Sequence, residues 1–263
     1  MTKTLVMKFG GAAVSSPCLF ARIADIILQR RREYSRITVV VSAMGDTTNQ
    51  LIHLANEVNP NPPRREYDML VSVGERISIS LLAMALAAKD HQAVSFTGSQ
   101  SGIITCGNHS EARIVDVRPH RLIPVLDVGS VVIVAGFQGV SRSGEITTLG
   151  RGGSDTSAVA LGIALKAEKV EFFKDVPGIF ASDPKQNPKA HFFSELSYDE
   201  ALNIIQNGAR VLQPRSVELA KKNHMTLHVM SFSGFTLENH TGTCIRSRTN
   251  CNPPGSPIYE ELC

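Results

Sequence analysis

The chain has 263 residues, of which 43% are hydrophobic and 19% charged, and its formal net charge is +3. This length and apolar content suffice for one large core or for two lobes. The small net charge and the short basic clusters argue against a nucleic-acid-binding protein. The five cysteines are scattered without C-x-x-C spacing, and there is no H-E-x-x-H motif, so we expect neither a disulfide framework nor a transition-metal site.

The apolar runs of the sequence bear on its location. The amino-terminal residues lead into a strand and lack the apolar stretch of a signal peptide. We find no run that approaches the ~20 apolar residues of a membrane span. The expectation is therefore a cytoplasmic protein without membrane contacts.

The first elements predict a βαβ unit. Residues 5–9 read as a strand that ends at Gly10 and Gly11, residues 16–33 as a helix with one buried face, and residues 37–41 as a β-branched strand of the kind found in parallel sheets. The polar residues 42–45 leave that second strand. Open α/β sheets bind ligands at the carboxyl ends of their strands, where these two loops would meet.

The next stretch predicts helices. Residues 47–58 form one helix, and the proline-rich residues 59–65 form a linker too short to separate domains. Residues 66–89 form one long helix or two helices joined near Gly74, apolar enough to be buried or packed on a partner subunit. Glu75 interrupts this apolar run. A buried carboxylate needs a partner, so Glu75 either belongs to a core salt bridge, the commoner case, or faces a ligand.

Strand and helix patterns alternate through the remaining chain. Further strands are expected at residues 94–97, 113–117, 131–135, 170–173, 227–231 and 242–245, a hairpin at 140–146, and helices at 197–205, with a Ser197/Glu200 capping box, and 214–222. This alternation predicts an α/β fold, a three-layer αβα sandwich with a mainly parallel central sheet. The last residues, 249–263, have the composition of a loosely held tail.

The stretch from Thr147 to Lys166 stands out for chemistry. Glycines precede Ser154 and Asp155, one of which is expected as the N-cap of a buried helix. Free amides at a helix start favour an anion, and Arg151 could grip a carboxylate by two bonds. On this segment alone, a plain capped glycine turn is an equally good interpretation.

Six segments in order resemble the amino acid kinase superfamily and, within it, the catalytic domain of aspartate kinases. They are KFGGAAV, VVVSAMGDTTN, VGE, TLGRGGSD, KDVPGIFASDP and NGARVLQP. The resemblance implies an amino acid kinase domain over residues 1–248, with an amino-acid lobe at about 1–150 and an ATP lobe at about 151–248. It implies transfer of a phosphoryl group from ATP to the side-chain carboxylate of L-aspartate, giving 4-phospho-L-aspartate.

The resemblance also implies roles for individual residues. Lys8 would stabilise the transferring phosphoryl group, and Asp155 would orient Lys8. Arg151 would bind the α-carboxylate of aspartate and Glu75 its ammonium group. The further residues implied in substrate binding are Ser42, Thr48, Gly152, Gly153 and Ser154.

The nucleotide is expected on a second group of residues. Those implied in ATP binding are Lys8, Gly10, Gly11, Lys174, Asp175, Phe180, Lys185 and Arg210. Magnesium should accompany ATP, held mostly by phosphates and water, so no protein metal ligand is expected. The alternative without a role in ATP binding is that residues 174–184 form a turn-rich connector and that Lys185 and Arg210 are surface residues.

Some positions depart from the family pattern. Ala12 and Ala13 stand where aspartate kinases usually carry hydroxyls, Lys174 replaces a usual threonine, and Arg210 and Gln213 replace a commoner lysine and histidine. The chain also lacks the length for paired ACT domains. We therefore expect a catalytic domain without its own feedback site, regulated, if at all, by a separate subunit, and a homodimer through the apolar helix after Glu75.

Two other functions remain open at this stage. One is another carboxylate kinase of the superfamily, acting on acetylglutamate or glutamate. Glu75 distinguishes this alternative, because an acylated amino group needs no anionic partner. The other is a non-catalytic regulator that binds nucleotide or amino acid, for which the departures at Ala12, Ala13 and Lys174 are the motivation.

Overall fold

An eight-stranded sheet forms the middle layer of the protein. The computed structural model describes residues 2–182, 184, 187, 189–209, 211–236, 241–248 and 253–261. The strand order is β12-β14-β13-β9-β1-β2-β6-β3, and among the described pairs only β13 with β14 is antiparallel. The strands are β1 (Thr4–Phe9), β2 (Arg36–Val41), β3 (Ala93–Phe96), β6 (Val131–Ala135), β9 (Lys169–Lys174), β12 (Glu195–Leu196), β13 (Leu227–Ser231) and β14 (Gly242–Ile245).

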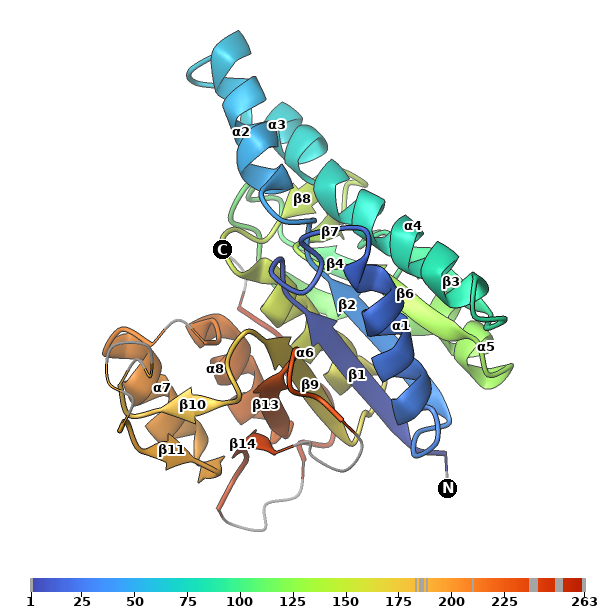
Figure 1. Cartoon of the computed structure of the whole chain (residues 1–263). Helices are drawn as coiled ribbons and strands as arrows, with labels where there is room; N and C mark the ends of the chain where they lie inside the picture. Colours follow the sequence, from blue (N-terminus) through green and yellow to red (C-terminus); the bar gives the residue numbers. More distant parts are fainter. Residues whose placement is uncertain are drawn as a thin grey trace.

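Helices cover both faces of this sheet (Figure 1). One face carries α1 and α4, and the other carries α5, α6 and α8, with α7 packed on α8. The helices are α1 (Leu19–Arg30), α2 (Thr47–Val58), α3 (Arg64–Val71), α4 (Val73–Ala87), a 3-10 turn η1 (Pro119–Arg121), α5 (Leu122–Asp127), α6 (Gly153–Ala164), α7 (Tyr198–Gln206) and α8 (Pro214–Asn223). The expected three-layer αβα sandwich is confirmed.

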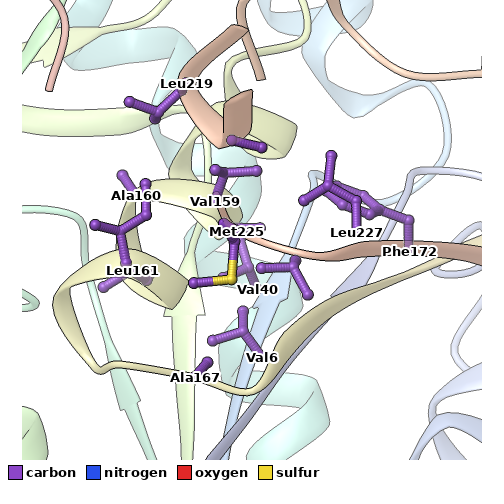
Figure 2. Close-up of a cluster of buried hydrophobic side chains, with 14 of the residues drawn as sticks. Val6, Val40, Val159, Ala160, Leu161, Ala167, Phe172, Leu219, Met225 and Leu227 are labelled. Atoms are coloured by element: carbon purple, nitrogen blue, oxygen red, sulfur yellow. The ribbon is translucent and has the colours of Figure 1, made fainter. Parts of the chain in front are cut away.

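The sequence of β1 shows why both layers form. Side chains alternate across a strand, and here both faces are apolar, so each face must be covered. Val6 joins the core on the side of α6, whereas Leu5 and Met7 join the core on the side of α1. Figure 2 shows the first of these cores, to which Val6 of the sheet, Val159 of α6 and Met225, which precedes β13, all contribute.

The apolar stretch after the proline-rich linker forms two helices, α3 and α4, which meet at Ser72. The combined run Arg64–Ala87 has 24 residues, and its most apolar window has a mean hydropathy of 1.6. Among the described residues it is the one helical run with the length and apolarity of a membrane span, so the expectation that no run approaches such a span was wrong. Ile79, Leu82 and Leu86 pack in the core, which explains much of this apolarity within the fold.

Two smaller sheets complete the described structure. One has the order β5-β4-β7-β8 and the other is β10-β11. Their strands are β4 (Ile103–Thr105), β5 (Ile114–Val117), β7 (Gln138–Ser141), β8 (Ile146–Thr148), β10 (Ile179–Phe180) and β11 (Phe192–Phe193). The expected hairpin is therefore β7-β8, which delivers the chain to the glycine-rich stretch, while β4 and α5 had no counterpart in the prediction.

The described part of the carboxyl-terminal tail is anchored, contrary to the expectation of a loose end. The backbone N–H of Glu260 donates to the carbonyl of Ile114, and the Glu260 carboxylate accepts from Arg215. The side chain of Asn223 exchanges hydrogen bonds with both backbone groups of Ile258. The amino-acid composition predicted a loosely held tail, because composition gives no information on contacts with residues far away in the chain.

Candidate active site

A cavity of about 1040 Å³ opens at the carboxyl ends of β13, β9, β1 and β2, which are neighbours in the sheet. Ligand pockets commonly measure ~300–1,000 Å³, so this one has room for a nucleotide together with a small second ligand. The predicted site residues that line it are Lys8, Gly10, Gly11, Ser42, Thr48, Glu75, Arg151, Gly152, Gly153, Ser154, Asp155, Lys174 and Asp175. Tertiary structure thus brings together residues from five separate segments.

The centre of the cavity is a buried cluster of charges. Lys8 extends from β1, and its Nζ lies 2.6 Å from Oδ1 of Asp155, in the first turn of α6. The Nζ of Lys174, at the end of β9, lies 3.1 Å from the other carboxylate oxygen, Oδ2. All three side chains are largely buried. One carboxylate therefore orients two ammonium groups at the cavity wall.

Burial and neighbouring charge set the protonation of this cluster. Burial lowers the pKa of Lys8 to about 8, although the Asp155 carboxylate acts in the opposite direction, and the charge of Lys174 lowers it further. Burial alone would raise the pKa of Asp155, but the charges of the two lysines outweigh it, so this pKa lies below its ordinary value. Asp155 is consequently ionised at neutral pH, and Lys8 is mostly protonated there, so an anion that binds beside it would favour its charged form further.

Glu75 is the second charged feature of the cavity. Its side chain, in the first turn of α4, is 3% exposed, and Oε1 accepts a hydrogen bond from the backbone N–H of Ala43 at 3.1 Å. Oε2 is buried and has no hydrogen-bond partner. Burial raises the pKa of Glu75 to about 8. A buried oxygen without a partner is unfavourable, and a cationic ligand group in the cavity would relieve it.

The glycine-rich loop before α6 forms one wall. Gly150 and Gly152 have φ values of +75° and +76°, which only glycine adopts without strain. A side chain at Gly152 would also collide with Gln213, because an added Cβ would lie 1.8 Å from its Cγ. Gly152 itself is the N-cap of α6, so the expectation of Ser154 or Asp155 at the N-cap was wrong. Local sequence did not reveal that a left-handed glycine starts the helix.

Arg151 lies between these two glycines and lines the cavity. Its side chain is exposed and makes no hydrogen bond or ion pair with the described residues. The start of α6 follows directly, so the positive end of the helix dipole and Arg151 face the same space. This side of the cavity suits a carboxylate or phosphate group.

The opposite wall is built by the loops after β1 and β2. The backbone at Gly10 lies close to the Lys8 ammonium, since an added Cβ would be 3.5 Å from Nζ. Gly11 packs against the carbonyl oxygens of Ala43 and Gly45. The two loops therefore meet at one edge, as the βαβ pattern predicted, and leave the backbone near Lys8 accessible to a ligand.

One predicted nucleotide residue within the described ranges, Phe180, is not part of this arrangement. Phe180 lies in β10, where its ring packs edge-on against Phe192 at 5.3 Å between centroids, and it does not line the cavity. Its expected role in ATP binding is therefore not supported, because the short β10-β11 sheet holds the side chain elsewhere. Lys185 and Arg210 lie outside the described residues.

Sequence reasoning missed several residues around the cavity. Phe232 and Ser233 follow β13, and the rule that ligands bind beyond strand ends could have indicated them. Asp68 is fully buried in α3 and had no local signal. Its carboxylate accepts hydrogen bonds from the backbone N–H and hydroxyl groups of Ser110 and Thr148, so it fixes two segments of the cavity wall.

The arrangement has a clear chemical capacity. Lys8, Lys174 and the start of α6 can hold anionic groups close together, whereas Glu75 can receive a cation. No group of three or more His, Cys, Asp or Glu side chains within the described ranges could hold a metal ion. The site suits charge stabilisation during group transfer.

A parallel α/β sandwich with cations converging on a large cavity at the strand ends defines a protein that handles small anionic ligands. The chain belongs to the amino acid kinase family, because the model described as "Amino acid kinase family" matches residues 3–231. This match includes both walls of the cavity.

Within this family the chain is similar to aspartokinases. It is 47% identical over 246 residues to the aspartokinase of Geobacillus stearothermophilus, covering 94% of this chain and 60% of that protein. The aspartate kinase structure from Synechocystis superposes with a TM-score of 0.85 at 41% identity, covering 98% of this chain and 42% of that one. The E. coli aspartokinase III complex with aspartate and ADP gives 0.82 at 27% identity, covering 94% and 65%. The chain therefore spans about 60% of the length of the curated relatives it matches.

Proposed function

We propose that the protein transfers the γ-phosphoryl group of ATP to the side-chain carboxylate of L-aspartate, giving 4-phospho-L-aspartate and ADP. The observation that carries the proposal is the unpartnered oxygen of buried Glu75 in the same cavity as the Lys8 ammonium. The first needs a cation and the second an anion, and aspartate with ATP supplies both. The similarity to aspartokinases, one of which was solved with aspartate and ADP, supports this choice of substrates.

In the proposed reaction, an oxygen of the aspartate side chain attacks the γ-phosphorus, and the bond to the bridging oxygen of the β-phosphate breaks. Arg151 binds the α-carboxylate by two hydrogen bonds, and Glu75 accepts from the ammonium group. Lys8 neutralises the charge that develops on the transferring group. Asp155 holds Lys8 in place and, because it is ionised, keeps its ammonium protonated.

Other chain groups complete the two binding sites. Ser42 and Thr48 line the aspartate side, while Gly10 and Gly11 leave backbone groups open toward the phosphates. Lys174 adds a second cation beside Asp155. In this proposal residues 1–150 bind mainly aspartate and residues 151–248 mainly ATP, with the glycine loop shared between them.

Magnesium enters with the nucleotide in this proposal. Mg²⁺ keeps several waters and binds readily through phosphate oxygens, so it needs no dedicated protein cage. This fits the lack of a three-ligand cluster among the described residues and the engagement of Asp155 with two lysines. When bound, the ion supplies further neutralisation of the triphosphate.

We further propose that the protein acts in the cytoplasm, where ATP is available, as a homodimer through the outer face of α3 and α4. Met69, Val73, Ile77 and Met84 are exposed there at 39%, 37%, 42% and 65%. Their spacing places them on one side of the helical run, and such an apolar stripe is typical of an interface. Ile77→Asp should convert a dimer in light-scattering measurements to a monomer; a monomeric wild type would refute this assembly.

The activity is tested with purified protein, MgATP and aspartate in the presence of hydroxylamine, which traps an acyl phosphate as a hydroxamate. We expect hydroxamate formation with aspartate and none with acetylglutamate or glutamate. Turnover with acetylglutamate that is insensitive to Glu75→Gln would favour that alternative. Ligand binding without ADP release, unchanged by Lys8→Ala, would instead favour a non-catalytic regulator.

A further inference from the structure

An arginine on α8 holds two carbonyl oxygens beside the loop that carries Arg151. Arg215 donates from Nη1 to the carbonyl oxygen of Leu149 at 2.7 Å, and from Nη2 to that of Ala112 at 3.0 Å. Leu149 is fully buried and directly precedes the loop. Arg215 therefore helps to fix the point from which Gly150, Arg151 and Gly152 leave the core, together with the bond from the Leu149 N–H to the carbonyl oxygen of Phe137.

The far end of the same loop also rests on the start of α8. Gly152 packs so closely on Gln213 that an added Cβ would lie 1.8 Å from its Cγ. Gln213 is the N-cap of α8, two residues before Arg215. Both ends of the loop are thus set by one helix start, and Arg151, which lies between them, has no anchor of its own in the described structure.

Arg215 is in turn held by the carboxyl-terminal segment. Its Nε and Nη2 donate to the two carboxylate oxygens of Glu260 at 2.8 Å and 3.0 Å. Glu260 Oε2 also accepts from the backbone N–H of Ile114 at 2.8 Å, and its side chain is only 9% exposed. A two-bond pair of this kind restricts the guanidinium plane more strongly than a single contact would. Its orientation decides whether Arg215 can reach both carbonyl groups.

We propose that Glu260 is a positioning residue for the amino-acid site, acting through Arg215 on the loop that carries Arg151. The inference rests on the proposed function, because that function makes Arg151 the ligand of the aspartate α-carboxylate. Without the Glu260 carboxylate, Arg215 keeps only its bonds to the carbonyl oxygens of Leu149 and Ala112, so its plane is less restricted and the loop leaves the core at a less defined angle. Aspartate binding then weakens more than ATP binding, since the side chains of Lys8 and Asp155 bond to each other and make no bond to Arg215 or Glu260.

The test is a kinetic comparison in the full chain of Glu260→Gln with the matched control Glu261→Gln, whose side chain is exposed and adjacent. We expect Glu260→Gln to raise the KM for aspartate about fivefold to tenfold, with the KM for ATP within twofold. Glu261→Gln should match the wild type, and Glu260→Asp should recover part of the loss. Equal changes in both KM values together with a lowered Tm would show that Glu260 only stabilises the fold. Unchanged kinetics would also overturn the proposal.

Hydrogen exchange separates this inference from the proposed function. Glu260→Gln should accelerate amide exchange in residues 150–153, whereas exchange in residues 9–13, at the other wall, should remain unchanged. If the wild type failed to phosphorylate aspartate, the proposed function would be refuted. The exchange result would still decide whether Glu260 is coupled to the loop at residues 150–153. Unchanged exchange at 150–153 would reject the coupling whatever the activity.

Discussion

Two clusters of buried charged side chains lie on opposite faces of the sheet. They contain similar groups but differ in whether a ligand can reach them. On the α1 side, Glu171 is fully buried and accepts from Arg30, with Lys169 Nζ at 3.0 Å. Arg30 also binds Glu33 and lies over the ring of Tyr34. On the α6 side, Asp155 holds Lys8 and Lys174.

The difference lies in access to the cavity. The Arg30–Glu171 cluster is closed: both Glu171 oxygens accept from cations, and neither residue lines the large cavity. The Lys8–Asp155 cluster opens onto it and faces Glu75, which has an unpartnered oxygen. Burial of charge alone therefore does not mark a function. A buried charge that is left incompletely satisfied beside a cavity does.

The largest expected effect is on the open cluster. Lys8→Met keeps the length of the side chain but removes its charge, and we expect kcat to fall by about 10³-fold, because nothing else occupies that position. The fold should persist, since Asp155 keeps Lys174 as a partner. Hydroxamate formation measures the loss, with the Tm as a check on folding. Activity within tenfold of the wild type would contradict the role of Lys8.

The closed cluster should respond in the opposite way. Glu171→Gln leaves Arg30 and Lys169 without their shared carboxylate, and we expect the free energy of unfolding to fall by about 3 kcal/mol. The kcat and both KM values of the folded enzyme should stay within twofold. Urea unfolding and kinetics at low temperature test both parts. A selective loss of activity would show that this cluster also serves the site.

Glu75→Gln should weaken aspartate binding and stabilise the fold. We expect the KM for aspartate to rise about thirtyfold, the loss of a charged hydrogen bond. In the wild type this KM should fall as the pH rises toward 8, because Glu75 has a pKa of about 8 and must lose its proton to receive an ammonium group. The variant should lose that dependence.

The stability effect of Glu75 follows from the same pKa. Its pKa in the folded state is raised to about 8 from an ordinary value of 4.5, so ionisation disfavours the fold, and wild-type stability falls as the pH rises between these values. Glu75→Gln should therefore have a higher Tm than the wild type at pH 8, with a free energy of unfolding larger by about 4 kcal/mol, and should show little difference near pH 4.5. Equal stability at pH 8 would mean that Glu75 is solvated or paired.

The smallest effect is expected at Lys174, the second lysine bound to Asp155. Lys174→Met removes a positive charge that lowers the pKa of Lys8. The pKa of Lys8 should rise, so the alkaline limb of the pH profile of kcat/KM should move upward by about half a unit. The KM for ATP should rise about threefold. A limb that moves downward would exclude Lys174 as a neighbour of Lys8.

Much of the fold could be predicted from local pattern. Residues 131–135 were predicted as a strand with the observed bounds, because a continuous apolar run rich in valine and isoleucine fits a strand buried on both faces. The predicted strand at residues 227–231 also has the observed bounds. The capping box of Ser197 and Glu200 was predicted and is formed. In contrast, β4 has only three residues, and α5 contains Pro124, so neither carried a usable signal.

The site was predictable in part. The Lys8–Asp155 contact joins residues 147 positions apart, and it was inferred from resemblance to a family rather than from spacing. Phe180 does not line the cavity, because its ring packs on Phe192, which comes from a strand that local pattern did not indicate. Asp68 and Glu260 were missed because a carboxylate gives no sign in sequence of whether distant donors surround it.

The sequence by itself determined the alternating strands and helices, the glycines that permit left-handed turns, and the kinds of charge available to a site. Only the tertiary structure decided which charges are closed off and which face a cavity, since this depends on contacts between segments far apart in the chain. Lys8 and Arg30 both carry buried positive charge. The fold satisfies Arg30 completely and leaves Lys8 facing open space beside Glu75, where a ligand can complete the balance of charge.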